Sequence, residues 1–166
     1  MVKSAATRYL PFSGKQELFL YCIRRGAILA VFAIFYNINV IYLLNSTKGS
    51  FVSPRRMSSG LFIAAFISPV LENLVLLGIS FTMSRLAAFR VPVSVLFACL
   101  FCFSIHPFSF QILTPAILFI LIAITNLRAF DTHGIEVTWI YLATLSMHLL
   151  YNLIVISAFW MGTSLS

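Results

Sequence analysis

Long apolar runs separated by short polar breaks dominate the chain. Five runs occupy residues 26–44, 60–84, 91–105, 112–127 and 137–160, and basic residues, prolines or histidines mark the breaks between them. Such runs approach the roughly 20 residues that a helix needs to cross a bilayer, and their lack of short alternation excludes a β-barrel. The pattern therefore predicts an all-α fold, a polytopic transmembrane helical bundle of about five helices.

The amino-acid composition indicates that this bundle lies in lipid. Hydrophobic residues make up 61% of the 166 residues, charged residues only 9%, and the mean hydropathy is +1.02. A soluble domain of this length has too little interior to hide so much apolar surface, so the expected partner is the lipid bilayer. The net charge of +7 would indicate nucleic acid in a soluble protein. Here the basic residues lie at the ends of apolar runs, so we interpret them as topology signals and expect no nucleic-acid partner.

Charge placement gives a topology. Residues 1–25 form a basic N-terminal arm, and 26–160 form a single membrane-embedded domain. The first run is longer than a signal-peptide core and lacks a clear cleavage site, so it is expected to be retained. Placing the N-terminus in the cytoplasm puts eight Lys and Arg residues inside and three outside, as the positive-inside rule favours. A short basic-armed bundle is typical of a bacterial inner or cell membrane.

One carboxylate interrupts the second run. Glu72 lies in the stretch S-P-V-L-E-N-L-V-L-L-G, where a charged side chain costs roughly 2.5–3.5 kcal/mol on insertion scales and usually has a task. Pro69 precedes it by three residues and is expected to bend the helix beside a wet cavity. Asn37 and Asn39, in the first run, are expected to form interhelical hydrogen bonds, with a substrate contact as the alternative.

Three further polar groups match Glu72 in depth. His148 and Asn152 are four residues apart and share a helical face, and His106 ends the third run. Counted from the nearest charged residue at the cytoplasmic end of each helix, Glu72 lies roughly 20 Å deep, His106 24 Å, His148 18 Å and Asn152 24 Å, at about 1.5 Å per residue. A shared buried site explains this agreement. A carboxylate, two imidazoles and an amide can together activate water and stabilise an oxyanion.

The order and spacing of these residues resemble a known family, the CAAX-protease and bacteriocin-processing (CPBP) intramembrane glutamic proteases, which include the Ras-converting prenyl endopeptidase. The family motifs are E-E-x-x-x-R, F-x-x-x-H and H-x-x-x-N. Here E-N-L-V-L-L begins at Glu72, C-F-S-I-H ends at His106, and H-L-L-Y-N runs from His148 to Asn152, so that the similarity covers 60–156.

The resemblance implies roles for four catalytic residues. Glu72 falls on the general base, His106 on the water-activating histidine, and His148 with Asn152 on the oxyanion-binding pair. It also implies a hydrophobic or lipidated peptide or protein substrate, and neither a cofactor nor a metal. The sequence departs from the family at Asn73, which replaces the second Glu, at Leu77, which replaces the Arg, and at Cys102, which replaces the Phe.

Two other functions remain open from the sequence. A catalytically weakened family member would use the same pocket to bind a peptide, as a bacteriocin-immunity-type membrane protein would. A haem or metal protein would use His106 and His148 as axial ligands. No redox motif accompanies these histidines, and a zinc site usually adds a third protein ligand beside an open position.

Overall fold

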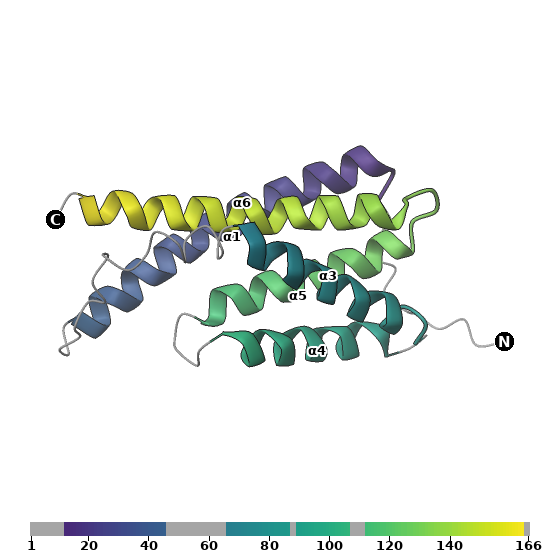
Figure 1. The fold of residues 1–166 in the computed structure, drawn as a ribbon, viewed down its shortest axis with the longest axis horizontal. Helices are drawn as coiled ribbons and strands as arrows, with labels where there is room; N and C mark the ends of the chain where they lie inside the picture. Colours follow the sequence, from purple (N-terminus) through teal and green to yellow (C-terminus); the bar gives the residue numbers. More distant parts are fainter. Residues whose placement is uncertain (1–11, 46–65, 87–88, 107–111, 165–166) are drawn as a thin grey trace.

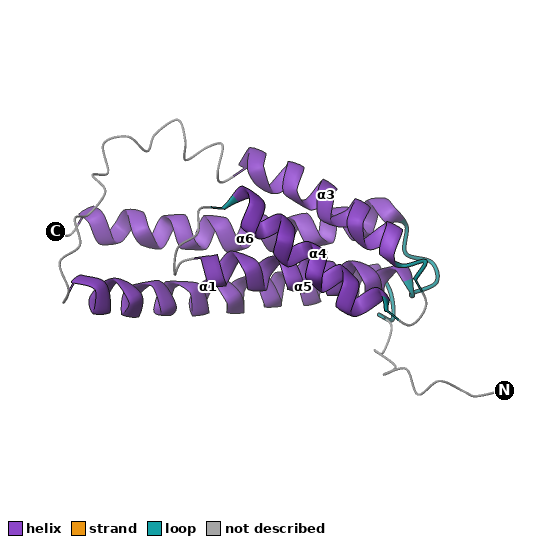
Figure 2. Ribbon diagram, turned by 90° about the horizontal axis from the view of Figure 1, so that it is seen from below, coloured by secondary structure: helices purple, strands orange, loops and turns teal. Residues whose placement is uncertain are grey.

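The fold consists of five α-helices. The structure is a computed structural model that describes residues 12–45, 66–86, 89–106 and 112–164. Its helices are α1 (Lys15–Asn45), α3 (Ser68–Met83), α4 (Arg90–Ile105), α5 (Leu113–Phe130) and α6 (Val137–Ser164). Figure 2 shows no strand in the part of the chain that the structure describes. The predicted all-α bundle of about five helices is confirmed.

Three of the helices are long and apolar enough to cross a membrane. The qualifying segments are Lys15–Val40 in α1, Leu113–Phe130 in α5 and Val137–Ala158 in α6. The apolar helices α3 and α4 have 16 residues each, about 24 Å of helix against a hydrocarbon core of about 30 Å. The chain is therefore a membrane protein by the length and composition of its helices.

Helix α5 lies at the centre of the bundle. It contacts all four other helices, whereas α1 packs mainly along α6, which crosses it in Figure 1. Consistent with this position, 56% of the α5 span is buried, against 33% of the spans in α1 and α6. The side chains of α5 therefore form a wall of the bundle interior, against which α3 and α4 both pack while also touching one another.

Two ion pairs mark one end of the bundle. Arg90 Nη1, at the start of α4, lies 2.6 Å from Asp131 Oδ1, just beyond the end of α5. Lys15 Nζ, at the start of α1, lies 3.2 Å from Glu136 Oε1, just before α6. Successive helices therefore run in opposite directions between this charged end and the other end of the bundle (Figure 1).

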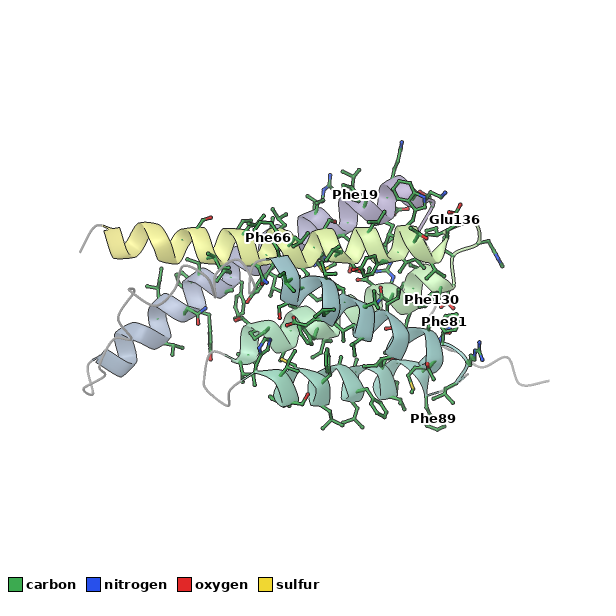
Figure 3. The ribbon with its side chains drawn as sticks, viewed as in Figure 1. Phe19, Phe66, Phe81, Phe89, Phe130 and Glu136 are labelled. Carbon is green, nitrogen blue, oxygen red and sulfur yellow. The ribbon has the colours of Figure 1, made fainter. Side chains whose placement is uncertain are left out.

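Large apolar side chains cover the outside. Figure 3 shows Phe19 on α1 and Phe89 before α4 pointing away from the bundle, and Phe89 is 71% exposed. Further exposed examples are Phe35 on α1, Leu71 on α3 and Leu96 on α4. Soluble monomers rarely expose so much contiguous apolar surface, and lipid is the solvent that suits it.

One predicted helix boundary is wrong. Helix α1 begins at Lys15 and not at residue 26, so residues 15–25 of the predicted arm are helical. The charges there are tolerated because they lie outside and stack on aromatic rings, as Arg25 does over Tyr21 at 5.3 Å. Pro69 lies in the first turn of α3, directly after a π-helical turn at 66–67, so helical backbone continues on both sides of it. The bend expected at Pro69 stays a prediction, because the predicted helical residues 60–65, like residues 1–11 of the arm, lie outside the described residues.

Candidate functional site

One face of α3 supplies several buried polar residues of the site. Its buried residues recur three or four positions apart, which places them on one side of the helix: Pro69, Glu72, Asn73, Leu76 and Ser80. Glu72 is 7% exposed, whereas the preceding Leu71 is 61% exposed. The sequence thus turns the single carboxylate of α3 into the bundle and an apolar side chain out of it.

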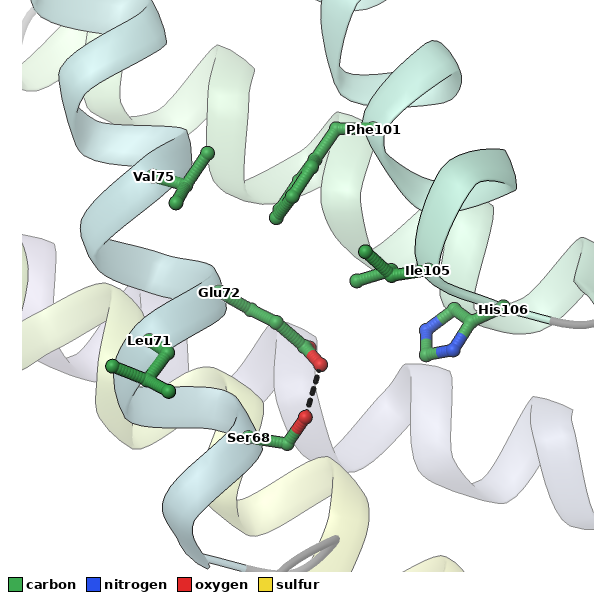
Figure 4. Close-up of a pocket in the computed structure, with 7 residues that line it drawn as sticks. All are labelled: Ser68, Leu71, Glu72, Val75, Phe101, Ile105 and His106. Carbon is green, nitrogen blue, oxygen red and sulfur yellow. Dashed lines mark hydrogen bonds between the residues drawn. The ribbon is translucent and has the colours of Figure 1, made fainter.

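Both carboxylate oxygens of Glu72 have a partner. The Ser68 hydroxyl, one turn earlier on α3, donates a hydrogen bond to Oε1, as Figure 4 shows. Nε2 of His148, on α6, lies 3.4 Å from Oε2. The carboxylate is therefore held between its own helix and α6, which limits the directions in which it can act.

The second ring nitrogen of His148 is also in contact with α3. Nδ2 of Asn73 lies 3.3 Å from His148 Nδ1. Asn73 has no exposed surface and His148 is 3% exposed. Consecutive residues of α3 thus contact the two nitrogens of one imidazole, which fixes the ring in its plane.

His106 reaches the site from the end of α4. Its backbone is extended, with φ −105° and ψ 140°, and its N–H donates to the Cys102 carbonyl at 3.0 Å. The following residue in the sequence is Pro107, which disfavours helical geometry in the residue before it and so ends the helix here. Figure 4 shows the imidazole of His106 facing the region of the Glu72 carboxylate from the opposite side of a cavity.

One aromatic ring on α5 separates the two imidazoles. The centroid of the Phe119 ring lies 5.7 Å from that of His106 and 5.7 Å from that of His148. Phe119 is fully buried. Since α5 is the central helix, this ring anchors both histidines to the middle of the bundle.

All four predicted catalytic residues line a single cavity of about 440 Å³. Its full lining consists of Asn37, Ser68, Glu72, His106, Thr114, Pro115, Leu118, His148, Tyr151, Asn152, Val155 and Ile156. A second cavity of about 280 Å³, shown in Figure 4, is lined by Ser68, Leu71, Glu72, Val75, Phe101, Ile105 and His106. Ser68, Glu72 and His106 line both cavities, so the carboxylate is accessible from two sides.

Sequence reasoning missed several polar residues of the site. Asn37 was expected to bond to another helix, with a substrate contact as the alternative; it lines the cavity, and among the described residues its buried Oδ1 has no hydrogen-bond partner. The same expectation is wrong for Asn39, whose amide donates to the Phe35 carbonyl of its own helix at 2.7 Å. Ser68 was detectable, because a hydroxyl four residues before a carboxylate shares its face. Asn73 was seen only as a missing carboxylate.

Within α3 as the structure describes it, Glu72 is the one charged side chain. Leu77 is partly buried and packs against the hydrophobic core. Among the described residues, no group of three or more His, Cys, Asp or Glu side chains is placed to hold one metal ion. Ser68 and His148 are therefore the groups that orient the carboxylate.

The fold and this cavity define a class: a helical membrane protein with an ionisable polar site inside the bundle. Comparison of the chain with protein-family models, with curated proteins and with solved structures found no match.

Proposed function

We propose that this protein is an intramembrane endopeptidase in which Glu72 activates a water molecule to hydrolyse a peptide bond. The supporting observation is that Glu72, His106, His148 and Asn152, from α3, the end of α4 and α6, line one cavity inside an apolar bundle. The resemblance of their motifs to the CPBP glutamic proteases supplies the reaction type. Intramembrane ionisable groups are rare and are usually functional, which favours a chemical role for this cluster.

The reaction needs only the groups in the cavity and one water. The Glu72 carboxylate removes a proton from the water while its oxygen forms a bond to the scissile carbonyl carbon, so that the carbonyl oxygen becomes an oxyanion. The C–N bond then breaks, and the proton held on Glu72 passes to the leaving nitrogen. The products are a carboxylic acid and an amine, and the Glu72 carboxylate is regenerated.

The other residues stabilise the charges that develop during these steps. His106 faces the carboxylate and is placed to hold the attacking water against it. His148 and Asn152, one helical turn apart on α6, provide N–H donors for the oxyanion. Removing one such donor from an enzyme typically costs about 3–4 kcal/mol of transition-state stabilisation, so this pair is expected to carry much of the rate.

A hydrophobic or lipidated peptide is the proposed substrate. The cavity between α3 and α4 is lined by Leu71, Val75 and Ile105, whose side chains are also exposed on the apolar surface of the bundle. An apolar group in the bilayer can therefore approach Glu72 without crossing water. We place the protein in a bacterial inner or cell membrane with a cytoplasmic N-terminus, which puts the charged end of the bundle on the cytoplasmic side.

Cleavage of a prenylated or membrane-peptide reporter by purified protein in detergent tests this proposal. Glu72→Gln and His148→Ala are expected to abolish cleavage while the protein stays folded. The matched controls are Glu136→Gln and His133→Ala, which change the same residue types at exposed positions of the charged end. Both controls are expected to cleave normally. A parent protein that cleaves none of the reporters, or cleavage that survives Glu72→Gln, would contradict the proposal.

A second function follows from one observation. Leu77 packs against the core where the resembled family carries an arginine, so α3 lacks the charge pair that supports the base in that family. A weakened relative would bind a peptide in the same cavity without hydrolysing it. Retained binding of the reporter, lost on filling the cavity by Asn152→Leu, together with no cleavage, would identify this alternative.

A further inference from the structure

The strongest unexplained feature of the site is the contact between Asn73 and His148. Asn73 is fully buried, and its amide meets Nδ1 of the imidazole at 3.3 Å, on the opposite side from Glu72. It stands where the resembled motif has a carboxylate. A replacement that only removed a charge would leave the position free to be apolar, yet this chain keeps a polar side chain at a fully buried position.

The donors and acceptors around His148 are consistent with one protonation pattern. Glu72 is acceptor-only when ionised, so the nitrogen facing it, Nε2, must carry a proton to make a favourable contact. A neutral imidazole then has its lone pair on Nδ1, and among the described residues the NH₂ of Asn73 is placed to donate to it. The orientation of the amide agrees, since Nδ2 is the atom nearest to Nδ1.

The alternative orientation of the amide is less favourable. With Nδ2 directed at His148, the atom of Asn73 left without a partner among the described residues is Oδ1. Turning the amide over would leave the NH₂ group buried without an acceptor, and unpaired buried N–H groups are rarer in proteins than under-satisfied carbonyl oxygens. It would also require a proton on Nδ1, and a neutral ring would then direct its Nε2 lone pair at the carboxylate.

We infer that Asn73 is a positioning residue that holds His148 as the Nε2–H tautomer, with its N–H directed at the reacting carboxylate. The inference rests on the proposed function for its catalytic consequence, but the tautomer itself can be measured without any substrate. In the reaction, the same Nε2–H is the donor that the oxyanion needs beside Glu72. The other tautomer would present a lone pair to the oxyanion and repel it.

The matched substitution is Asn73→Asp, because it keeps the size of the side chain and removes its donors. An ionised aspartate at this position can only accept, so it is expected to bind a proton on Nδ1 and to convert neutral His148 to the opposite tautomer. Asn73→Leu is expected to leave a mixture of tautomers. Asn126→Leu changes another fully buried asparagine, on α5, and is expected to leave His148 unchanged.

The experiment is nitrogen NMR of the full chain in detergent with ¹⁵N-labelled histidine. His148→Gln identifies the His148 signals among those of the three histidines. The parent protein is expected to show a protonated Nε2 and an unprotonated Nδ1, and Asn73→Asp is expected to show a protonated Nδ1. A parent ring protonated on Nδ1, alone or together with Nε2, would overturn the inference, and this measurement decides it even where a variant fails to fold.

Kinetics with the cleavable reporter separate the two proposals. Asn73→Asp is expected to lower kcat at least tenfold with little change in KM, since the oxyanion donor acts only in the transition state, and Asn73→Leu is expected to lower kcat by less because part of the tautomer mixture keeps the Nε2–H donor. The expected tautomer in a parent protein that cleaves no reporter would remove the peptidase proposal and keep the assignment of Asn73. Normal kcat in a variant whose tautomer has changed would overturn the positioning role.

Discussion

The Ser68 hydroxyl donates a hydrogen bond to the Glu72 carboxylate from one turn earlier on α3. Because the two residues are four apart on one helix, the backbone alone fixes their relation. Ser68 lines both cavities beside Glu72, and it leaves Oε2 to His148. The candidate base is thus oriented by a neutral group of its own helix, in a chain that has no arginine at the corresponding motif position.

Removing this hydroxyl is expected to weaken catalysis more than folding. A hydrogen bond to a charged group contributes about 1.5–3 kcal/mol, so Ser68→Ala is predicted to lower kcat by about 10- to 100-fold. Steady-state cleavage of the peptide reporter measures this loss. Ser104→Ala is the control, because the Ser104 hydroxyl is exposed and donates to the Phe101 carbonyl of its own helix. Equal kcat in the two variants would remove Ser68 from the site.

Local sequence patterns predict some features of this protein and not others. Apolar run lengths predict the five helices, because lipid requires unbroken apolar helical segments. Helical spacing also predicts that His148 and Asn152 act together, and the depth estimate anticipates that Glu72 and His106 line the same cavity as this pair. The start of α1 could not be predicted from hydropathy, because its first turns carry Lys15, Glu17 and two arginines on an amphipathic surface.

The role of Asn73 illustrates what the sequence could not provide. Its importance depends on the rotation of α3 against α6, which is set by tertiary packing and is not encoded in either helix alone. Phe119 is similar, since nothing distinguishes it from the 16 other phenylalanines until the fold brings it between two imidazoles. Local pattern thus predicts the reactive groups, and only the packed bundle reveals the residues that hold them.

Phe119 is predicted to link the packing of α5 to activity. Phe119→Leu keeps an apolar core but removes the ring contacts with both imidazoles, tilted to His106 and edge-on to His148, and aromatic pairs are worth about 0.5–1.5 kcal/mol each. We expect kcat to fall by up to about tenfold and the thermal midpoint to fall by a few degrees. Phe130→Leu serves as the control, since Phe130 pairs with Phe81 at 5.7 Å near the charged end (Figure 3). It should lower the midpoint without changing kcat, and a fall of similar size in both variants would contradict the link.

Gly26 is predicted to be required for the packing of α1 against α6. A methyl group on Gly26 would lie 2.7 Å from the carbonyl oxygen of Met147, the residue before His148. Gly26→Ala should therefore separate the helices and cost about 1–3 kcal/mol, as overpacked contacts do. The thermal midpoint in detergent measures this cost, and reporter cleavage should fall because α6 carries His148.

Gly78→Ala is the matched control, since nothing lies within 4 Å of its added methyl group and alanine is the better helix former. An unchanged midpoint in Gly26→Ala would show that α1 does not pack closely on α6.

Asn126 is predicted to destabilise the bundle. It is fully buried on α5, and within the described part of the chain neither Nδ2 nor Oδ1 of its amide has a hydrogen-bond partner. An unsatisfied buried polar group costs about 1–3 kcal/mol, and leucine of similar shape avoids that cost. Asn126→Leu is therefore expected to raise the thermal midpoint and to leave reporter cleavage unchanged, because Asn126 does not line either cavity.

Asn73→Leu provides the contrast, since that amide contacts His148 and its loss should lower kcat. A lower midpoint for Asn126→Leu would mean that the amide is satisfied by a group such as a buried water, and the position would then be a structural hydrogen-bonding site in the centre of the bundle.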